Sequence, residues 1–184
     1  MEIHDTDKYE SGYIPEYLER VRTPKRIMEV GVKNGGSLLL WCNLWPRLER
    51  VIGVDLNPPL RDLHPKISVV QIDQRDSASL DRIASVEGPF DLIIDDASHF
   101  GEASWVTFRA LWPHVAPGGL YVVEDWTVGY LHSWPDGAEY SDLPPPGHTA
   151  GMVGMIKRMV DELEAGNMKR LDVLYGLAFA HKAL

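Results

Sequence analysis

Two pairs of acidic residues carry the clearest chemical signal in this sequence of 184 residues. Asp95-Asp96 follows the apolar run 90–94, and Glu124-Asp125 follows the apolar run 119–123. Short apolar runs that contain β-branched residues predict buried strands of a parallel sheet. If the two strands are neighbours, their carboxyl ends lie about 5 Å apart, at the edge where open α/β sheets bind ligands.

A histidine, His99, comes three residues after Asp96. We therefore expect four carboxylates and one imidazole to meet at this edge of the sheet. Carboxylates that lie so close repel one another strongly unless a positive group lies among them. A divalent cation is the simplest such group.

A glycine-rich loop joins the first predicted strand to the helix that follows it. The loop and its flanks read Glu29-Val30-Gly31-Val32-Lys33-Asn34-Gly35-Gly36-Ser37. Glycines permit positive φ and let a ligand approach the backbone. Lys33 takes the place of the second glycine of a dinucleotide fingerprint, and the chain has no Gly-Lys-Ser/Thr, so neither NAD or FAD nor a P-loop nucleotide is expected.

The acidic residue Asp55 ends the next predicted strand, 20 residues after Gly35. An acid in this place hydrogen-bonds ribose hydroxyls, which predicts a nucleoside cofactor without a pyrophosphate. S-adenosylmethionine fits that description. Asp73 and Gln74 are expected to flank its adenine, and the acids of Glu29 and Asp95 to attract the sulfonium or amino group of its methionine part. The candidate cofactor-binding residues are Glu29, Gly31, Lys33, Gly35, Ser37, Asp55, Asp73, Gln74 and Asp95.

Strands that alternate with helices predict a Rossmann-like, doubly wound α/β fold in a single domain, 1–184. Predicted strands cover 26–30, 51–54, 67–72, 90–94, 119–123, 171–174 and 177–180, and predicted helices cover 13–22, 37–45, 77–86, 101–112 and 152–163. The last two strands form a hairpin, so the sheet has seven strands and is mostly parallel with an antiparallel C-terminal edge. The aromatic and proline-rich stretch 126–150 shows no periodicity and is predicted to be a loop that forms a lid over the site.

Composition narrows the partners and the compartment. A net charge of −9 disfavours nucleic acid, whose binding depends on Lys and Arg contacts to phosphate. The single cysteine excludes an internal disulfide and nothing suggests secretion, and no apolar run approaches the roughly 20 residues of a membrane span. We expect a cytoplasmic protein with a small-molecule substrate, and leave open whether it forms a homo-oligomer.

The order of these motifs resembles a known family, the metal-dependent O-methyltransferases that act on macrolide sugars (the mycinamicin type). The cephalosporin-hydroxylase-like proteins share much of the pattern. The motifs are Glu-x-Gly-x-x-x-Gly-Gly-Ser from Glu29, Asp73-Gln74, Asp-Asp-x-Ser-His at 95–99, Pro-Gly-Gly-Leu-Tyr at 117–121 and Glu-Asp at 124–125. The resemblance implies a methyltransferase that uses S-adenosylmethionine and Mg²⁺ and acts on a hydroxyl of a small molecule, such as a natural-product sugar or polyketide.

The resemblance also implies roles for individual residues. Asp96, Glu124 and Asp125 are implied to ligate Mg²⁺, and His99 to be the general base. Oxygen ligands favour Mg²⁺, or Mn²⁺, over zinc. An unperturbed histidine pKa of about 6.5 suits proton abstraction near neutral pH.

Three alternatives remain open from the sequence. An iron-dependent hydroxylase usually needs two histidines and a carboxylate, and only His99 lies in the acidic motifs. A methyltransferase for a catechol-like phenol would also use a divalent metal, and a planar substrate suits the aromatic stretch 126–150. A non-catalytic protein that binds S-adenosylmethionine is disfavoured because the acidic residues and His99 are all present.

Overall fold

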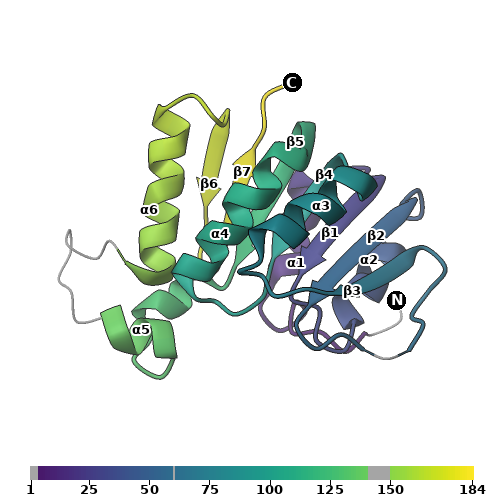
Figure 1. Cartoon of the computed structure of the whole chain (residues 1–184), viewed down its shortest axis with the longest axis horizontal. Helices are drawn as coiled ribbons and strands as arrows, with labels where there is room; N and C mark the ends of the chain where they lie inside the picture. Colours follow the sequence, from purple (N-terminus) through teal and green to yellow (C-terminus); the bar gives the residue numbers. More distant parts are fainter. Residues whose placement is uncertain (1–3, 60, 141–149) are drawn as a thin grey trace.

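A seven-stranded sheet forms the centre of the computed structural model, which describes residues 4–59, 61–140 and 150–184. The strands are β1 (Arg26–Val30), β2 (Arg50–Asp55), β3 (Ile67–Gln71), β4 (Phe90–Asp95), β5 (Val115–Glu124), β6 (Arg170–Val173) and β7 (Leu177–His181). In the described part of the chain they lie in the order β3-β2-β1-β4-β5-β7-β6 (Figure 1). The first five are parallel, whereas β7 is antiparallel to both β5 and β6. The predicted Rossmann-like sheet with an antiparallel C-terminal hairpin is therefore confirmed.

Helices cover both faces of this sheet (Figure 1). They are α1 (Tyr13–Arg20), α2 (Gly36–Leu44), α3 (Ser77–Glu87), α4 (Gly101–Leu111), η1 (Trp112–His114), η2 (Trp126–Tyr130), α5 (Pro135–Tyr140) and α6 (Gly151–Glu164). Side chains of α1 and α2 form one buried cluster with the sheet, and side chains of α3, α4 and α6 form another on the opposite face. Strand β4 shows the alternation, since Ile93 belongs to the second cluster and Leu92 and Ile94 to the first. Burying each such side chain contributes about 1.5–3 kcal/mol.

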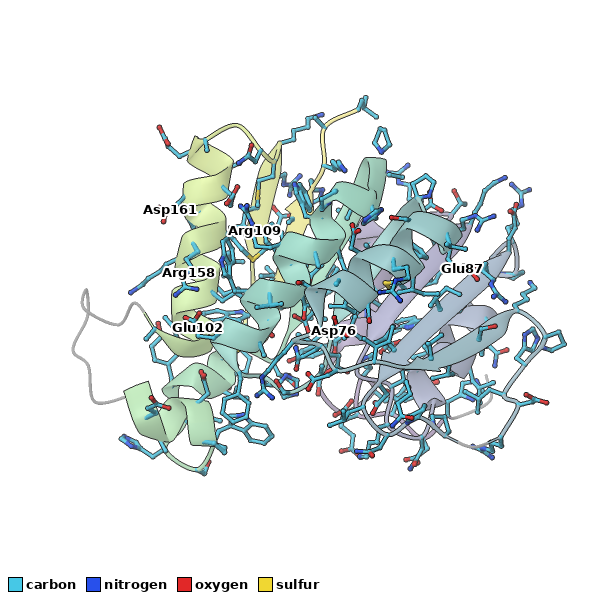
Figure 2. All side chains as sticks on the ribbon, in the orientation of Figure 1. Asp76, Glu87, Glu102, Arg109, Arg158 and Asp161 are labelled. Atoms are coloured by element: carbon cyan, nitrogen blue, oxygen red, sulfur yellow. The ribbon has the colours of Figure 1, made fainter. Side chains whose placement is uncertain are left out.

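Exposed ion pairs join the outer surfaces of α4 and α6. Figure 2 shows Glu102 and Arg158 reaching toward each other from the two helices, and Arg158 Nη1 lies 3.1 Å from Glu102 Oε2. Arg109 and Glu162 form a second pair at 3.2 Å. Exposed pairs contribute little to stability, so the packing of the two helices on the sheet depends on the buried cluster beneath them.

The acidic pairs lie side by side because β4 and β5 are neighbours, as predicted. Asp95 is in register with Val123, one residue before Glu124. The start of β5 differs from the prediction: the strand begins at Val115 and not at residue 119, so the Pro-Gly-Gly run 117–119 lies within it. The pairing jumps from Phe90–Val115 to Leu92–Leu120, so a bulge accommodates the extra residues of β5.

The stretch predicted to be a loop, 126–150, is helical over much of its described part. It contains η2 and α5, which pack on α6, and the remainder, 141–149, lies outside the described residues. The carboxylate of Asp136 accepts hydrogen bonds from the backbone N–H groups of Gly101 (3.2 Å) and Met152 (2.7 Å). This buried side chain thus ties α5 to the first turns of α4 and α6, a long-range contact that no local pattern reveals. In the part of the chain that the structure describes, no helix has the length and apolar character needed to span a membrane.

Candidate metal centre and cofactor pocket

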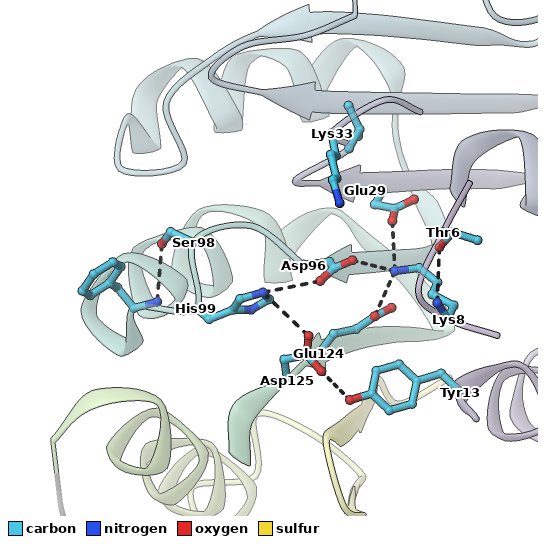
Figure 3. A network of polar contacts seen from close by, with 12 residues as sticks. Thr6, Lys8, Tyr13, Glu29, Lys33, Asp96, Ser98, His99, Glu124 and Asp125 are labelled. Atoms are coloured by element: carbon cyan, nitrogen blue, oxygen red, sulfur yellow. Dashed lines mark hydrogen bonds and ion pairs between the residues drawn. The ribbon is translucent and has the colours of Figure 1, made fainter. Parts of the chain in front are cut away.

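Three side chains converge beyond the carboxyl ends of β4 and β5 (Figure 3). His99 Nε2 lies 3.8 Å from Asp96 Oδ1 and 3.7 Å from Asp125 Oδ2, and the three ligand atoms all lie within 4.8 Å of one another. We call Asp96, His99 and Asp125 the outer cluster. Carboxylate oxygens and an imidazole nitrogen are suitable donors for a divalent cation, so this set fits a metal ion.

The backbone of the outer cluster is strained at two positions. His99 and Asp125 have φ angles of 53° and 54°. Residues other than glycine rarely adopt this left-handed backbone region, and such strained residues concentrate at functional sites. The conformation turns both side chains toward Asp96 instead of along the paths of the strands.

Glu124 has a different environment from the outer cluster. It is 1% exposed, its Oε1 accepts a hydrogen bond from the Tyr17 hydroxyl at 2.5 Å, and its Oε2 accepts one from Lys8 Nζ at 2.9 Å. Both oxygens therefore have protein partners. A metal ion at Glu124 would share this carboxylate with Lys8 or Tyr17.

Lys8 is a buried cation that sequence reasoning missed. Its Nζ lies 2.6 Å from Asp96 Oδ2, 2.9 Å from Glu124 Oε2 and 3.4 Å from Glu29 Oε1, and its side chain is 1% exposed. Burial acts to lower its pKa, but the charges of Glu124, Asp96 and Glu29 outweigh burial and raise the pKa well above the ordinary value. Lys8 is therefore an ammonium ion. It comes from an irregular acidic segment, Thr6-Asp7-Lys8, for which the sequence predicted no role.

The carboxylates around Lys8 are not fully neutralised by it. Burial is the largest cause that raises the pKa of Glu29, Asp96 and Glu124, and it outweighs the opposing charge of Lys8 in each case. Neighbouring carboxylates add to the rise. The site therefore favours a further positive charge.

Asp95 does not join the other acids. It is the last residue of β4, and because successive strand residues alternate, its side chain points to the face opposite to that of Ile94. There it is 2% exposed, and the Tyr121 hydroxyl lies 3.4 Å from its Oδ2. Burial raises the pKa of Asp95 to about 7, although hydrogen bonds from Ser104 and Tyr121 oppose the rise. The prediction that four carboxylates of the two pairs meet is therefore wrong for Asp95. Asp96, Glu124 and Asp125 do meet, and Glu29 contacts Lys8 beside them.

Two cavities adjoin the outer cluster. The larger, about 580 Å³, is lined by the glycine loop together with Asp55, Asp96, His99 and Trp134. The smaller, about 220 Å³, is lined by residues that include Asp73 and Gln74. Both are lined by Gly31, Asp55 and Ala97, so they share a wall.

Gly31 allows the glycine loop to lie against the start of the outer cluster. Its φ is +89°, and a Cβ atom there would lie 2.1 Å from the carbonyl oxygen of Asp96. Only glycine meets both conditions. The loop is held on its other side by Asp55, whose Oδ2 accepts hydrogen bonds from the backbone N–H groups of Val32 (2.8 Å) and Lys33 (3.0 Å).

The predicted cofactor residues fall into four groups. Lys33 and Ser37 line the larger cavity, Asp73 and Gln74 line the smaller, and Gly31 and Asp55 line both. Gly35, Glu29 and Asp95 are not among the described lining residues of these cavities. Gly35 is the left-handed N-cap of α2, and Glu29 is buried, with Trp41 Nε1 donating to its Oε2 at 2.7 Å.

Helix α1 supplies two hydroxyl groups that sequence reasoning also missed. The Tyr13 hydroxyl donates to Asp125 and the Tyr17 hydroxyl to Glu124. Their spacing of four residues puts both on the buried face of the helix. That spacing was the available signal, but it predicted only an amphipathic helix.

An aromatic side chain from the stretch 126–140 lies over the outer cluster. The ring of Trp134 is 5.6 Å from that of His99, centroid to centroid, and Trp134 lines the larger cavity. The segment expected to cover the site therefore contributes one wall of it.

Comparison with known proteins defines the class. A family model described as a methyltransferase domain matches residues 28–126, which include the glycine loop and both acidic pairs. The chain therefore belongs to this methyltransferase-domain family.

Particular relatives agree with the resemblance seen in the motifs. Mycinamicin VI 2''-O-methyltransferase of Micromonospora griseorubida is 37% identical over 146 residues, which are 76% of this chain and 35% of that protein. The 8-demethyl-8-alpha-L-rhamnosyl tetracenomycin-C 2'-O-methyltransferase of Streptomyces olivaceus is 38% identical over 167 residues, 86% of this chain and 40% of that protein. The chain thus spans less than half the length of these relatives. The resemblance to macrolide-sugar O-methyltransferases is confirmed.

Solved structures give the same result. The MycE methyltransferase of the mycinamycin pathway, in complex with Mg, SAH and mycinamycin VI, superposes with a TM-score of 0.82 and 32% identity over 93% of this chain and 48% of that chain. A putative caffeoyl-CoA O-methyltransferase from Staphylococcus aureus matches with a TM-score of 0.63 at 15% identity, over 98% of this chain and 86% of that chain. The second likeness is one of fold alone.

Proposed function

We propose that this chain is an O-methyltransferase that uses S-adenosylmethionine and a divalent cation, Mg²⁺ or Mn²⁺, to methylate a hydroxyl of a natural-product sugar or polyketide. One observation carries the proposal: two residues of the outer cluster, Asp96 and His99, line the same cavity as the glycine loop. A methyl donor on the loop and a hydroxyl at the cluster would thus be neighbours. The sugar O-methyltransferases among the relatives, and the Mg and SAH in the MycE complex, support this assignment.

The two adjoining cavities suit the two parts of the cofactor. We assign the adenine to the smaller cavity, beside Asp73 and Gln74, and the ribose to Asp55 on the wall that the cavities share. The methionine part then lies along Gly31, Lys33 and Ser37. Gly35 has an indirect role, since it turns the chain into α2. Glu29 and Asp95 are not among the described lining residues of either cavity, so they would attract the methionine part of the cofactor only by their charge and without contact.

The acids beyond β4 and β5 are the proposed holders of the metal. Asp96 and Asp125 each present one carboxylate oxygen toward His99, and Glu124 is the third proposed ligand. When bound, the cation supplies a positive charge that favours loss of the proton from the acceptor hydroxyl. His99 would take that proton at Nε2, and the carboxylates of Asp96 and Asp125, which lie 3.8 and 3.7 Å from that atom, would then lie beside the positive imidazolium.

Trp134 gives the acceptor an aromatic wall next to His99. An exposed indole face suits the apolar face of a sugar ring, and positioning of the acceptor supplies much of the rate enhancement in such a transfer.

The net charge of −9 supports a small molecule over nucleic acid as the substrate. The outer cluster holds one imidazole among the described residues, whereas an iron hydroxylase usually needs two. We further propose one domain, 1–184, with a lid at 126–150 and a cytoplasmic location.

Replacing one outer carboxylate tests the proposal. Asp96→Asn removes one charge from the outer cluster and should lower Mg²⁺-stimulated methyl transfer to a rhamnosylated acceptor by about 100-fold or more, because ligand loss removes the cation's effect. Cofactor binding, measured by calorimetry with S-adenosylmethionine, should stay within a few-fold of wild type. Asp81→Asn is the matched control, since Asp81 is an exposed residue of α3 paired with His114.

Chelation gives the second arm of the same experiment. EDTA should abolish transfer by the wild-type protein, and Mg²⁺ should restore it. Full activity in EDTA, or an Asp96→Asn variant as fast as the Asp81→Asn control, would contradict the proposed metal dependence.

A further inference from the structure

A buried ammonium group already lies at the proposed metal site. Lys8 Nζ is 2.6 Å from Asp96 Oδ2 and 2.9 Å from Glu124 Oε2, and both acids are proposed metal ligands. The Lys8 side chain is 1% exposed, so these carboxylates and not water stabilise its charge. An ammonium ion and a divalent cation are attracted by the same oxygens.

We propose that Lys8 is a positioning residue that competes with the divalent cation for Asp96 and Glu124, and thereby sets the metal affinity of the site. The inference rests on the metal site proposed above. Lys8 holds the inner oxygen of Asp96, Oδ2, and leaves Oδ1 facing His99. It also holds Oε2 of Glu124, so a metal ion that recruits Glu124 has to weaken that contact.

Glu29 holds Lys8 from a third direction. Figure 3 shows contacts from Lys8 to Glu29 as well as to Asp96 and Glu124, and Glu29 Oε1 lies 3.4 Å from Nζ. Glu29 lies outside the described lining of both cavities. Its charge therefore acts on Lys8 and offsets part of the attraction between Lys8 and the proposed ligands.

The segment before α1 fixes the position of Lys8. A Cβ atom at Gly36 would lie 1.8 Å from the carbonyl oxygen of Asp5, so the glycine lets this segment pack against the first turn of α2. The backbone N–H of Tyr13 donates to the Lys8 carbonyl at 3.1 Å. The backbone of Lys8 is thus anchored on both sides, which keeps its side chain next to the carboxylates.

Metal affinity is the readout that separates competition from a structural role. Mn²⁺ is titrated by calorimetry into metal-free wild type, Lys8→Met and Glu29→Gln at one mildly alkaline pH. Lys8→Met should bind Mn²⁺ about tenfold more tightly or better, because it removes a unit positive charge at hydrogen-bonding distance from two ligands. A merely structural role predicts weaker binding, since a loosened site holds its ligands less well.

Glu29→Gln should have the opposite effect. It removes a carboxylate that shares Lys8, leaves the ammonium more strongly attracted to Asp96 and Glu124, and should weaken Mn²⁺ binding by a few-fold. Lys182→Met is the matched control, because Lys182 Nζ donates to the carbonyl oxygens of Trp112, Pro113 and Val115. Its Mn²⁺ affinity should equal that of wild type.

The outcomes separate this inference from the proposed function. A wild type that binds Mn²⁺ beside a Lys8→Met variant of equal or weaker affinity overturns the role of Lys8 and leaves the metal site standing. A wild type that binds no Mn²⁺ overturns both. If circular dichroism shows that Lys8→Met does not fold without metal, Glu29→Gln decides, and an unchanged or higher affinity there overturns the inference.

Discussion

The two acidic pairs, Asp95-Asp96 and Glu124-Asp125, both end neighbouring strands, but the register sets them one residue apart, because Asp95 lies beside Val123. Their inner residues therefore point to opposite faces of the sheet. The outer residues, Asp96 and Asp125, both face His99. The inner residue Glu124 lies on the face covered by α1 and contacts Lys8 and Tyr17. The inner residue Asp95 lies on the face covered by α4, with the Tyr121 hydroxyl at 3.4 Å.

This difference shows that a strand-end acid takes its role from the face to which it points. On the α1 face the ammonium group of Lys8 lies among Glu29, Asp96 and Glu124, and Asp96 also lines the larger cavity. On the α4 face burial raises the pKa of Asp95 to about 7, so its carboxyl group is largely uncharged below that pH. The inner acidic residue is thus a candidate metal ligand in one pair, Glu124, and a buried, titratable core residue in the other, Asp95.

The largest effect on turnover is expected at His99, which faces both Asp96 and Asp125. His99→Ala should lower turnover by about 10²–10⁴-fold, the usual contribution of a general base, with little change in cofactor binding. Steady-state kinetics with saturating S-adenosylmethionine would measure it. His114→Ala is the control, since His114 pairs with the exposed Asp81. Equal rates for the two variants would reduce His99 to a structural group.

A smaller effect, on stability, is expected on the other face. The folded pKa of Asp95, about 7, lies above the ordinary aspartate value of about 3.9. Between these values the folded protein binds more protons than the unfolded chain, so the free energy of unfolding falls as pH rises from about 4 to about 7. Asp95→Asn removes this loss. In EDTA it should gain about 1–3 kcal/mol relative to wild type between about pH 5 and about pH 8.

Urea unfolding at the two pH values measures this gain. Asp136→Asn is the matched control, because Asp136 is equally buried but both of its oxygens accept backbone N–H groups. The amide nitrogen of asparagine cannot accept, so Asp136→Asn should be destabilised at both pH values. A constant difference between Asp95→Asn and wild type across this range would show that Asp95 is charged throughout, and the contrast between the two faces would fail.

The sequence predicted the sheet well because each strand is a short apolar run bounded by a turn or an acid. It misplaced the start of β5, since a bulge opposite Phe90 is set by pairing and leaves no local pattern. It missed α5 because that short helix is held by the contacts of Asp136 with α4 and α6.

The part of the site that directly follows β4 and β5 could be predicted from the sequence. Asp96, His99 and Asp125 come together as the order of the strands requires. Asp95 is in register with Val123 and not with Glu124, so it points to the opposite face, and an offset of one residue is smaller than sequence patterns resolve. Lys8 could not be predicted, because its position depends on long-range packing of the segment before α1 against Gly36.

The central claim is that the cofactor and the metal occupy one edge of this sheet as neighbours. A crystal of the protein with S-adenosylhomocysteine and Mn²⁺, measured for anomalous scattering, tests it most directly. We expect a manganese peak at bonding distance from Asp96 and Asp125, and an adenosyl group against Gly31 and Asp55. A peak away from these carboxylates, or a cofactor bound elsewhere on the chain, would contradict it.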